Sequence, residues 1–159
     1  MVKVQLTKPK DFKQDIEIEI QGETHRVQYV NTGVPHAILF LEDVKNLDVQ
    51  NIGAKVRFHE KFKPSGTNVN FVSISRDGKL HLRTYERGVE AETYACGTGA
   101  AASAYVAHKL GYTNKNEVPV ITSGGEKLTI TIGEKDTLYL TGGATLVYEG
   151  KLNPHEIGL

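Results

Sequence analysis

The feature that most restricts the fold is a run of small apolar residues, 98–110, with no charged side chain before Lys109. The run is rich in alanine, the strongest helix former, and predicts an α-helix. Gly111 follows it and suits the position just after a helix C-terminus. A helix that is apolar on every side belongs inside a core. We therefore expect one long helix at the centre of the domain.

Most of the remaining chain alternates apolar and polar residues, which is typical of strands with one face in water. The expected strands cover residues 2–6, 15–20, 24–31, 36–42, 68–75, 79–86, 118–122, 127–132, 137–141 and 145–149. Arg-Asp-Gly at residues 76–78 predicts a hairpin turn. Asp48 is a candidate N-cap for a second, shorter helix that runs to about residue 58.

The expected strands are joined mostly by hairpins and do not alternate regularly with helices. This pattern favours an α+β fold, in which a strongly curved, mainly antiparallel sheet wraps around the one long central helix. A length of 159 residues fits a single domain, residues 1–159. A chain of this size buries roughly 68 to 70% of its unfolded surface, so a substantial core is expected.

Composition excludes several classes of partner. Lys plus Arg equals Asp plus Glu, so no basic field attracts nucleic acid or an anionic membrane. The longest mostly apolar run, residues 36–41, is far shorter than the ~20 residues of a membrane helix. One cysteine cannot form an internal disulfide, and residues 1–5 show no secretory apolar region. We expect a cytosolic, cytoplasmic protein whose partner is a small molecule or another protein.

The single cysteine, Cys96, lies just before the expected helix. Unpaired N–H groups and the helix dipole favour an anion there, and such a position can lower a cysteine pKa from about 8.5 to roughly 3.5 to 7.5. Gly97 and Gly99 lack a Cβ, so a carboxylate can approach the backbone closely. We expect Cys96 to act as a base or nucleophile near neutral pH. The alternative is an inert, buried thiol.

Two motifs around Cys96 resemble those of a known family. Glu-Arg-Gly at residues 86–88 and Ala-Cys-Gly-Thr-Gly at residues 95–99 resemble the second cysteine motif of the diaminopimelate epimerases. Gly-Val-Pro-His at residues 33–36 and Thr-Asn-Val-Asn-Phe at residues 67–71 resemble two further family motifs, in the same order. The resemblance covers nearly the whole chain but only the second half of the family's usual length, which implies the family's C-terminal domain.

The resemblance implies a cofactor-independent isomerase that interconverts LL- and meso-diaminopimelate, a precursor of lysine and peptidoglycan. Such an epimerase removes the α-proton with one cysteine and returns a proton to the opposite face with another. The family's first half, which carries a Cys-Gly-Asn-Gly motif, is missing from this sequence. We therefore expect the chain alone to be inactive until that half, or a second copy, completes the site around the amino-dicarboxylate substrate.

The resemblance also assigns catalytic residues. Cys96 matches one of the two catalytic cysteines, and Glu86 and His36 match positions that tune the protonation of the pair. A histidine after proline is also common as a hydrogen-bonded turn residue. The six histidines are scattered without zinc-like spacing, so no metal is expected, and the resemblance implies no cofactor.

Substrate-binding positions follow from the same motifs. They are Asn68, Glu86, Arg87, Gly97 and Thr98. The guanidinium of Arg87 suits a carboxylate because it binds planar anions with two hydrogen bonds. Val34 stands where many family members have a substrate-binding asparagine, so that contact is absent or comes from Asn31 or Asn70.

Three other functions stay open at the level of sequence. The Cys96 helix start could bind an anion without proton transfer, as a noncatalytic module. Two copies could pair so that two Cys96 thiols face one substrate. A cysteine hydrolase also uses a helix-start thiol, but no histidine here has a context that marks it as a dedicated base.

Overall fold

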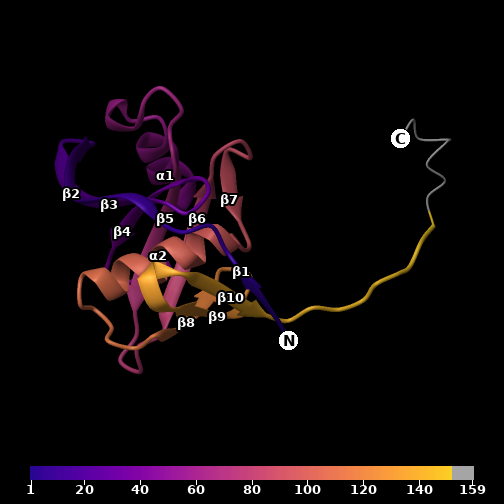
Figure 1. Cartoon of the computed structure of the whole chain (residues 1–159). Helices are drawn as coiled ribbons and strands as arrows, with labels where there is room; N and C mark the ends of the chain where they lie inside the picture. Colours follow the sequence, from indigo (N-terminus) through magenta and orange to yellow (C-terminus); the bar gives the residue numbers. More distant parts are fainter. Residues whose placement is uncertain (152–159) are drawn as a thin grey trace.

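The computed structural model describes residues 1–151, which form one mixed sheet and two α-helices (Figure 1). The strands are β1 (Val2–Gln5), β2 (Lys10–Ile20), β3 (Glu23–Asn31), β4 (Pro35–Phe40), β5 (Asn68–Ile74), β6 (Leu80–Glu86), β7 (Ala91–Thr93), β8 (Glu117–Thr122), β9 (Lys127–Ile132) and β10 (Leu138–Gly142). The helices are α1 (Val49–Arg57) and α2 (Gly97–Lys109), with short 3-10 turns at Glu60–Phe62 and Glu134–Asp136.

The ten strands lie in the order β1-β10-β9-β8-β6-β5-β4-β3-β2, and β7 pairs with β6. The β4–β5 and β6–β8 pairs are parallel, and the other pairs are antiparallel. The prediction of a mixed α+β domain with a mainly antiparallel sheet is therefore confirmed. The strong curvature expected of the sheet is not established by this pairing and stays a prediction.

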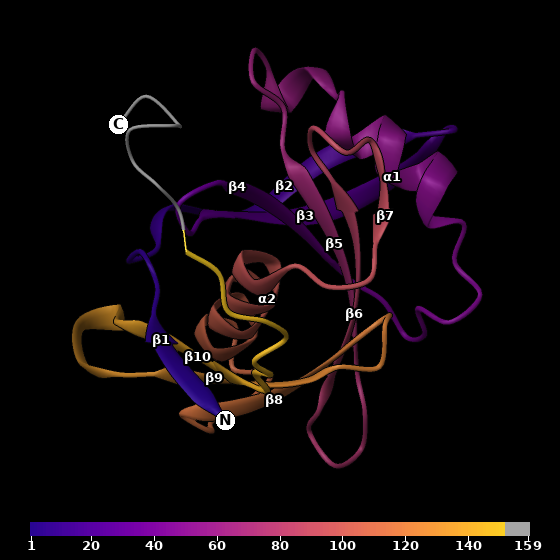
Figure 2. The ribbon, with the colours of Figure 1, turned by 90° about the vertical axis from the view of Figure 1, so that its right-hand side faces the viewer.

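Helix α2 occupies the centre of the domain, as its composition predicted. It contacts strands β3, β4, β5, β6, β8, β9 and β10. Figure 2 shows β3, β4 and β5 on one side of α2 and β8, β9 and β10 on the other. Nine consecutive residues of the helix, from Gly99 to Ala107, are buried. The small side chains of this segment let strands pack closely around it.

The middle of the sheet separates two apolar cores. Side chains alternate between the faces of a strand, so Ile38, Val72 and Leu82 join the core around α2. Leu39 and Phe71, on the opposite face, join the core that contains residues of α1. The two cores fix the three central strands from both faces.

Two helix ends match their sequence signals. The side chain of Asp48 accepts a hydrogen bond from Asn51 N at 3.1 Å and caps α1. Gly111 adopts a positive φ of 74° after α2, and Tyr112 N donates to Ala107 O at 2.9 Å. This bond, with Gly111 N donating to His108 O at 3.1 Å, is the Schellman pattern that satisfies the last carbonyls of a helix.

Two expectations about strands were wrong, and one strand was missed. Residues 145–149 form no strand, because no neighbouring strand pairs with them, and Leu146, Val147 and Tyr148 are exposed. Strand β2 begins at Lys10, well before the expected start. Strand β7 was not predicted, because it has only three residues.

No helix within residues 1–151 is long and apolar enough to cross a membrane.

Candidate active site

The sheet face toward α2 changes from apolar to polar near the start of that helix. Strand register puts His36 beside Asn68 and puts Asn70 beside Thr84. Glu86 lies two residues beyond Thr84 and therefore on the same face. The polar residues of β4, β5 and β6 thus gather where Cys96 precedes α2. The structure brings the predicted residues into one region.

Cys96 is the N-cap residue of α2, with an extended backbone and 9% of its surface exposed. Its Sγ lies 3.6 Å from Thr98 Oγ1. Burial raises the pKa of the Cys96 thiol, and the Glu86 carboxylate raises it further, whereas the Thr98 hydroxyl and the N–H groups of Gly99 and Thr98 lower it. The expected lowering of this pKa is therefore wrong for this chain, because desolvation of sulfur outweighs the helix start.

His36 is fully buried, at 0% exposure, and both of its ring nitrogens have partners. Nε2 lies 3.0 Å from Thr98 Oγ1, and Nδ1 lies 2.9 Å from Asn70 Nδ2. Burial, and secondarily the nearby Arg87 charge, lower the pKa of His36 to about 3. The ring is therefore neutral near pH 7. His36 lies in strand β4, as the expected strand over residues 36–42 predicted, and the alternative of a turn residue is wrong.

Asn70 and Thr84 complete the buried network around His36, and neither was predicted to do so. Thr84 Oγ1 donates to Asn70 Oδ1 at 3.0 Å, and both residues are buried. Because both polar ends of the Asn70 amide are engaged, Asn70 does not replace the contact missing at Val34. The available signal was spacing, since Asn70 lies two residues after Asn68 and shares its face.

Asn68 joins the two segments that flank the site. Its Nδ2 donates to Pro35 O at 3.0 Å, and its Oδ1 accepts from Arg87 N at 2.8 Å. The Arg87 guanidinium donates to Ser65 O at 3.4 Å. No ion pair within residues 1–151 joins Glu86, the last residue of β6, to Arg87, which begins the turn after that strand. Asn68 therefore fixes the backbone that carries Arg87.

The turn that contains Arg87 is stabilised by Glu90. Its carboxylate accepts from Gly88 N at 2.9 Å and from Arg57 Nε and Nη2 at 3.2 and 3.0 Å. Glu90 N donates to Glu86 O at 2.8 Å and closes the turn. Helix α1, through Arg57, thus anchors the loop that presents Arg87.

The remaining site positions lie at the end of β3, in the turn that follows it and at the start of α2. Val34 is half-buried, and its carbonyl accepts from Thr32 N at 3.2 Å. The side-chain oxygen of Asn31, Oδ1, accepts from Gly33 N at 2.9 Å, so this oxygen stabilises the turn. Thr32 Oγ1 donates to Thr98 O at 3.1 Å and ties the turn to the first residues of α2. Gly97, the first residue of α2, packs against β10.

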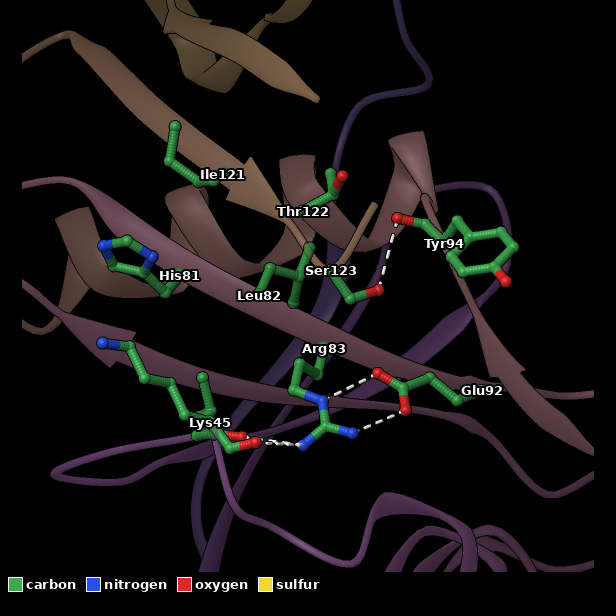
Figure 3. Close-up of a pocket in the computed structure, with 10 residues that line it drawn as sticks. Lys45, His81, Leu82, Arg83, Glu92, Tyr94, Ile121, Thr122 and Ser123 are labelled. Atoms are coloured by element: carbon green, nitrogen blue, oxygen red, sulfur yellow. Dashed lines mark hydrogen bonds and ion pairs between the residues drawn. The ribbon is translucent and has the colours of Figure 1, made fainter. Parts of the chain in front are cut away.

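A separate hollow of about 610 Å³ contains none of the predicted site residues (Figure 3). Arg83 lines this hollow and makes two 2.7 Å hydrogen bonds to the Glu92 carboxylate. Its Nη1 donates to the carbonyls of Val44, Lys45 and Leu47. All three nitrogens of this guanidinium have partners within the protein, so it holds the loop after β4 in place rather than binding an anion. Residues 1–151 contain no cluster of His, Cys, Asp and Glu suited to a metal.

The fold is shared with solved epimerase and racemase structures. A probable proline racemase from Agrobacterium radiobacter K84 superposes with a TM-score of 0.65, over 96% of this chain and 54% of that one, at 18% identity. A hydroxyproline epimerase from Agrobacterium vitis gives a TM-score of 0.64, over 88% of this chain and 48% of that one, at 16% identity. At these identities the likeness establishes the fold.

Sequence comparison identifies the family. The family model described as diaminopimelate epimerase matches residues 28–147. The diaminopimelate epimerase of a Hydrogenobaculum species is 49% identical over 96% of this chain and 55% of its own length. That of Aquifex aeolicus is 46% identical over 96% of this chain and 54% of its own length. The chain belongs to the diaminopimelate epimerase family, and it spans about half the length of these relatives.

Proposed function

We propose that this chain supplies one half of a cofactor-independent, two-cysteine epimerase that interconverts LL- and meso-diaminopimelate. In this proposal residues 1–159 are equivalent to the C-terminal domain of the family, and a first-cysteine half completes the site. The supporting observation is the position of Cys96, at the start of a buried helix and among polar residues that match the family motifs. The chain alone is inactive in this proposal, because it has one of the two acid/base groups.

Cys96 donates a proton in one direction of the proposed reaction. Its raised pKa keeps the thiol protonated at neutral pH, so it is ready to protonate the α-carbanion formed by a base on the opposite face. In the reverse direction the thiolate of Cys96 removes the α-proton. The Thr98 hydroxyl and the N–H groups of Thr98 and Gly99 stabilise that thiolate.

The substrate carboxylates have separate partners in this proposal. The α-carboxylate lies against the first N–H groups of α2, those of Gly97 and Thr98, where the helix dipole favours an anion. The guanidinium of Arg87, which Asn68 positions, binds the distal carboxylate. The side chain of Val34 offers no hydrogen bond, so in this proposal the distal end of the substrate has one polar contact fewer than in relatives with asparagine there.

Deuterium incorporation tests the proposal. The 159-residue chain is co-expressed with the first-half segment of the Hydrogenobaculum relative and incubated with LL-diaminopimelate in D2O. The expected result is exchange at the α-carbon by the mixture and none by either part alone. Cys96→Ala abolishes formation of the deuterated meso isomer by the mixture, because inversion needs an acid/base group on each face, whereas Ser103→Ala, which removes a buried hydroxyl from the same helix, leaves it nearly unchanged.

The other outcomes distinguish the alternatives. Binding of diaminopimelate by the mixture without exchange contradicts catalysis and favours an anion-binding module. Exchange by the chain alone, with a rate that rises as the square of its concentration, favours a homodimer that pairs two Cys96 sites.

A further inference from the structure

A directional chain of hydrogen bonds crosses the sheet and ends at Cys96. It runs from Thr84 to Asn70 at 3.0 Å, from Asn70 to His36 at 2.9 Å, from His36 to Thr98 at 3.0 Å and from Thr98 to the Cys96 sulfur at 3.6 Å. The first three residues come from β6, β5 and β4 and are buried. Such a fully satisfied buried network holds its members in one arrangement.

The Asn70 amide sets the direction of this chain. Its Nδ2 faces Ala37 O at 3.4 Å, and its Oδ1 accepts from the Thr84 hydroxyl. A flipped amide would face its oxygen toward the Ala37 carbonyl, where neither atom can donate. Nδ2 therefore donates to His36 Nδ1, which must be the unprotonated nitrogen of a neutral ring.

The remaining proton of the ring then determines how Thr98 is oriented. His36 Nε2 carries the hydrogen and donates to Thr98 Oγ1. Because that oxygen accepts from His36, the Thr98 hydroxyl hydrogen is free to point at the Cys96 sulfur. In the other tautomer, Nε2 would accept the hydroxyl hydrogen and withdraw it from sulfur.

We propose that Asn70 is a positioning residue that holds His36 in its Nε2–H tautomer and so directs the Thr98 hydroxyl to the Cys96 sulfur. Its amide does not touch the substrate. It acts through two intervening side chains and favours the thiolate whenever Cys96 gives up its proton. The inference rests on the proposed role of Cys96 as a proton donor and acceptor, but its test measures the thiol directly.

Other groups around the sulfur also affect its titration. Glu86 on β6 acts on the Cys96 thiol, and the charge of Arg87 acts on His36 on β4. Thr32, in the turn after β3, and Leu140 on β10 lie beside the first residues of α2 and carry no titratable group. Because Asn70 is uncharged, replacing it leaves the electrostatic effects of Glu86 and Arg87 in place.

The test is the pH profile of Cys96 alkylation by iodoacetamide. Cys96 is the only cysteine, so the reaction reports on this thiol alone. Asn70→Leu keeps the size of the side chain and removes the amide. The midpoint of its profile is expected to rise by about 0.5 pH unit or more, which slows alkylation about threefold below the midpoint.

A double-mutant cycle separates positioning from general loosening of the core. In a Thr98→Val chain the link to sulfur is already cut, so Asn70→Leu is expected to cause no further shift. Ser103→Ala removes a buried hydroxyl of α2 that donates to Gly99 O. This hydroxyl is not part of the hydrogen-bond chain from Thr84 to Cys96, here called the relay, so the profile stays unchanged. An unchanged profile in folded Asn70→Leu, or an equal shift in the Thr98→Val background, overturns the proposal.

A measurement on the unmodified chain covers the case in which Asn70→Leu fails to fold. The 15N chemical shifts of the imidazole ring identify which nitrogen carries the proton. Protonated Nε2 and unprotonated Nδ1 on His36 at pH 7 support the proposal, and the reverse assignment rejects it. Neither result depends on deuterium exchange, so the proposed function can fail while this inference stands.

Discussion

Gly99 lies so close to Asn70 that a Cβ on the glycine would overlap the Asn70 Oδ1 atom. The same Cβ would lie 3.2 Å from the Cys96 sulfur. Helix α2 therefore needs glycine here for space, because the relay passes directly against its first turn. Alanine is otherwise the better helix former, so the two effects oppose each other.

Gly99→Ala is expected to lower the free energy of unfolding by about 1 to 3 kcal/mol, because overpacking outweighs the gain in helix propensity. Urea unfolding measures this change. Gly143→Ala is the matched control, since a Cβ there meets no atom within 4 Å. A Gly99→Ala chain as stable as the original would show that Asn70 moves aside at no cost.

The raised pKa of Cys96 predicts slow alkylation and a pH-dependent stability. The folded chain holds the thiol proton more tightly than the unfolded chain, so this contribution to stability is complete below the unfolded pKa of about 8.5. It is lost as pH rises through the folded pKa. Unfolding free energies of the original and Cys96→Ala chains should therefore converge as the pH rises from 8 to 10. Three tyrosines with raised pKa values are common to both chains and cancel in the comparison.

His36 predicts the opposite pH dependence. Its pKa falls from an ordinary 6.5 to about 3 on folding, so the stability it contributes is present above pH 6.5 and is lost as the pH falls toward 3. In this window the free energy of unfolding is expected to fall by up to about 1.4 kcal/mol per pH unit. A His36→Gln chain lacks this slope, and equal slopes in the two chains between pH 6 and 4 would contradict the prediction.

The Arg83–Glu92 ion pair is expected to make a measurable electrostatic contribution to the free energy of unfolding. Its side chains are 21% and 27% exposed, and the contact has two hydrogen bonds. Glu92→Gln is expected to lower the unfolding free energy by about 1 kcal/mol, with the difference shrinking in high salt. Lys79→Gln, which breaks the more exposed pair with Asp77, should change stability less. Equal effects of the two substitutions would show that the Arg83–Glu92 pair contributes no more to stability than an exposed surface ion pair.

Much of the fold follows from local sequence. Composition placed α2 inside the core, Asp48 and Gly111 marked helix ends, and alternation located most of the strands. The strand expected at residues 145–149 failed because an apolar and polar pattern does not supply a pairing partner. Alternation along one segment reports which residues share a face, but not which segments become neighbours.

The site was less accessible from sequence for the same reason. The hydrogen-bond chain needs His36, Asn70 and Thr84 on three adjacent strands. Two of these strands, β4 and β5, pair in parallel although a long segment that includes α1 separates them in the sequence. The pKa of Cys96 depended on two opposing effects. The helix start was visible in the sequence, whereas the extent of burial required the packed structure.

The enclosure of α2 by seven strands has a consequence for how activity can be altered. A helix with nine consecutive buried residues cannot rotate or slide without disrupting most of the core. The sulfur of Cys96 is therefore held in one position, and in the proposed reaction the substrate carbon must be brought to it. Changes in substrate preference should come from the surrounding turns, such as the one that contains Val34, while changes within the helix should affect the folding of the whole domain.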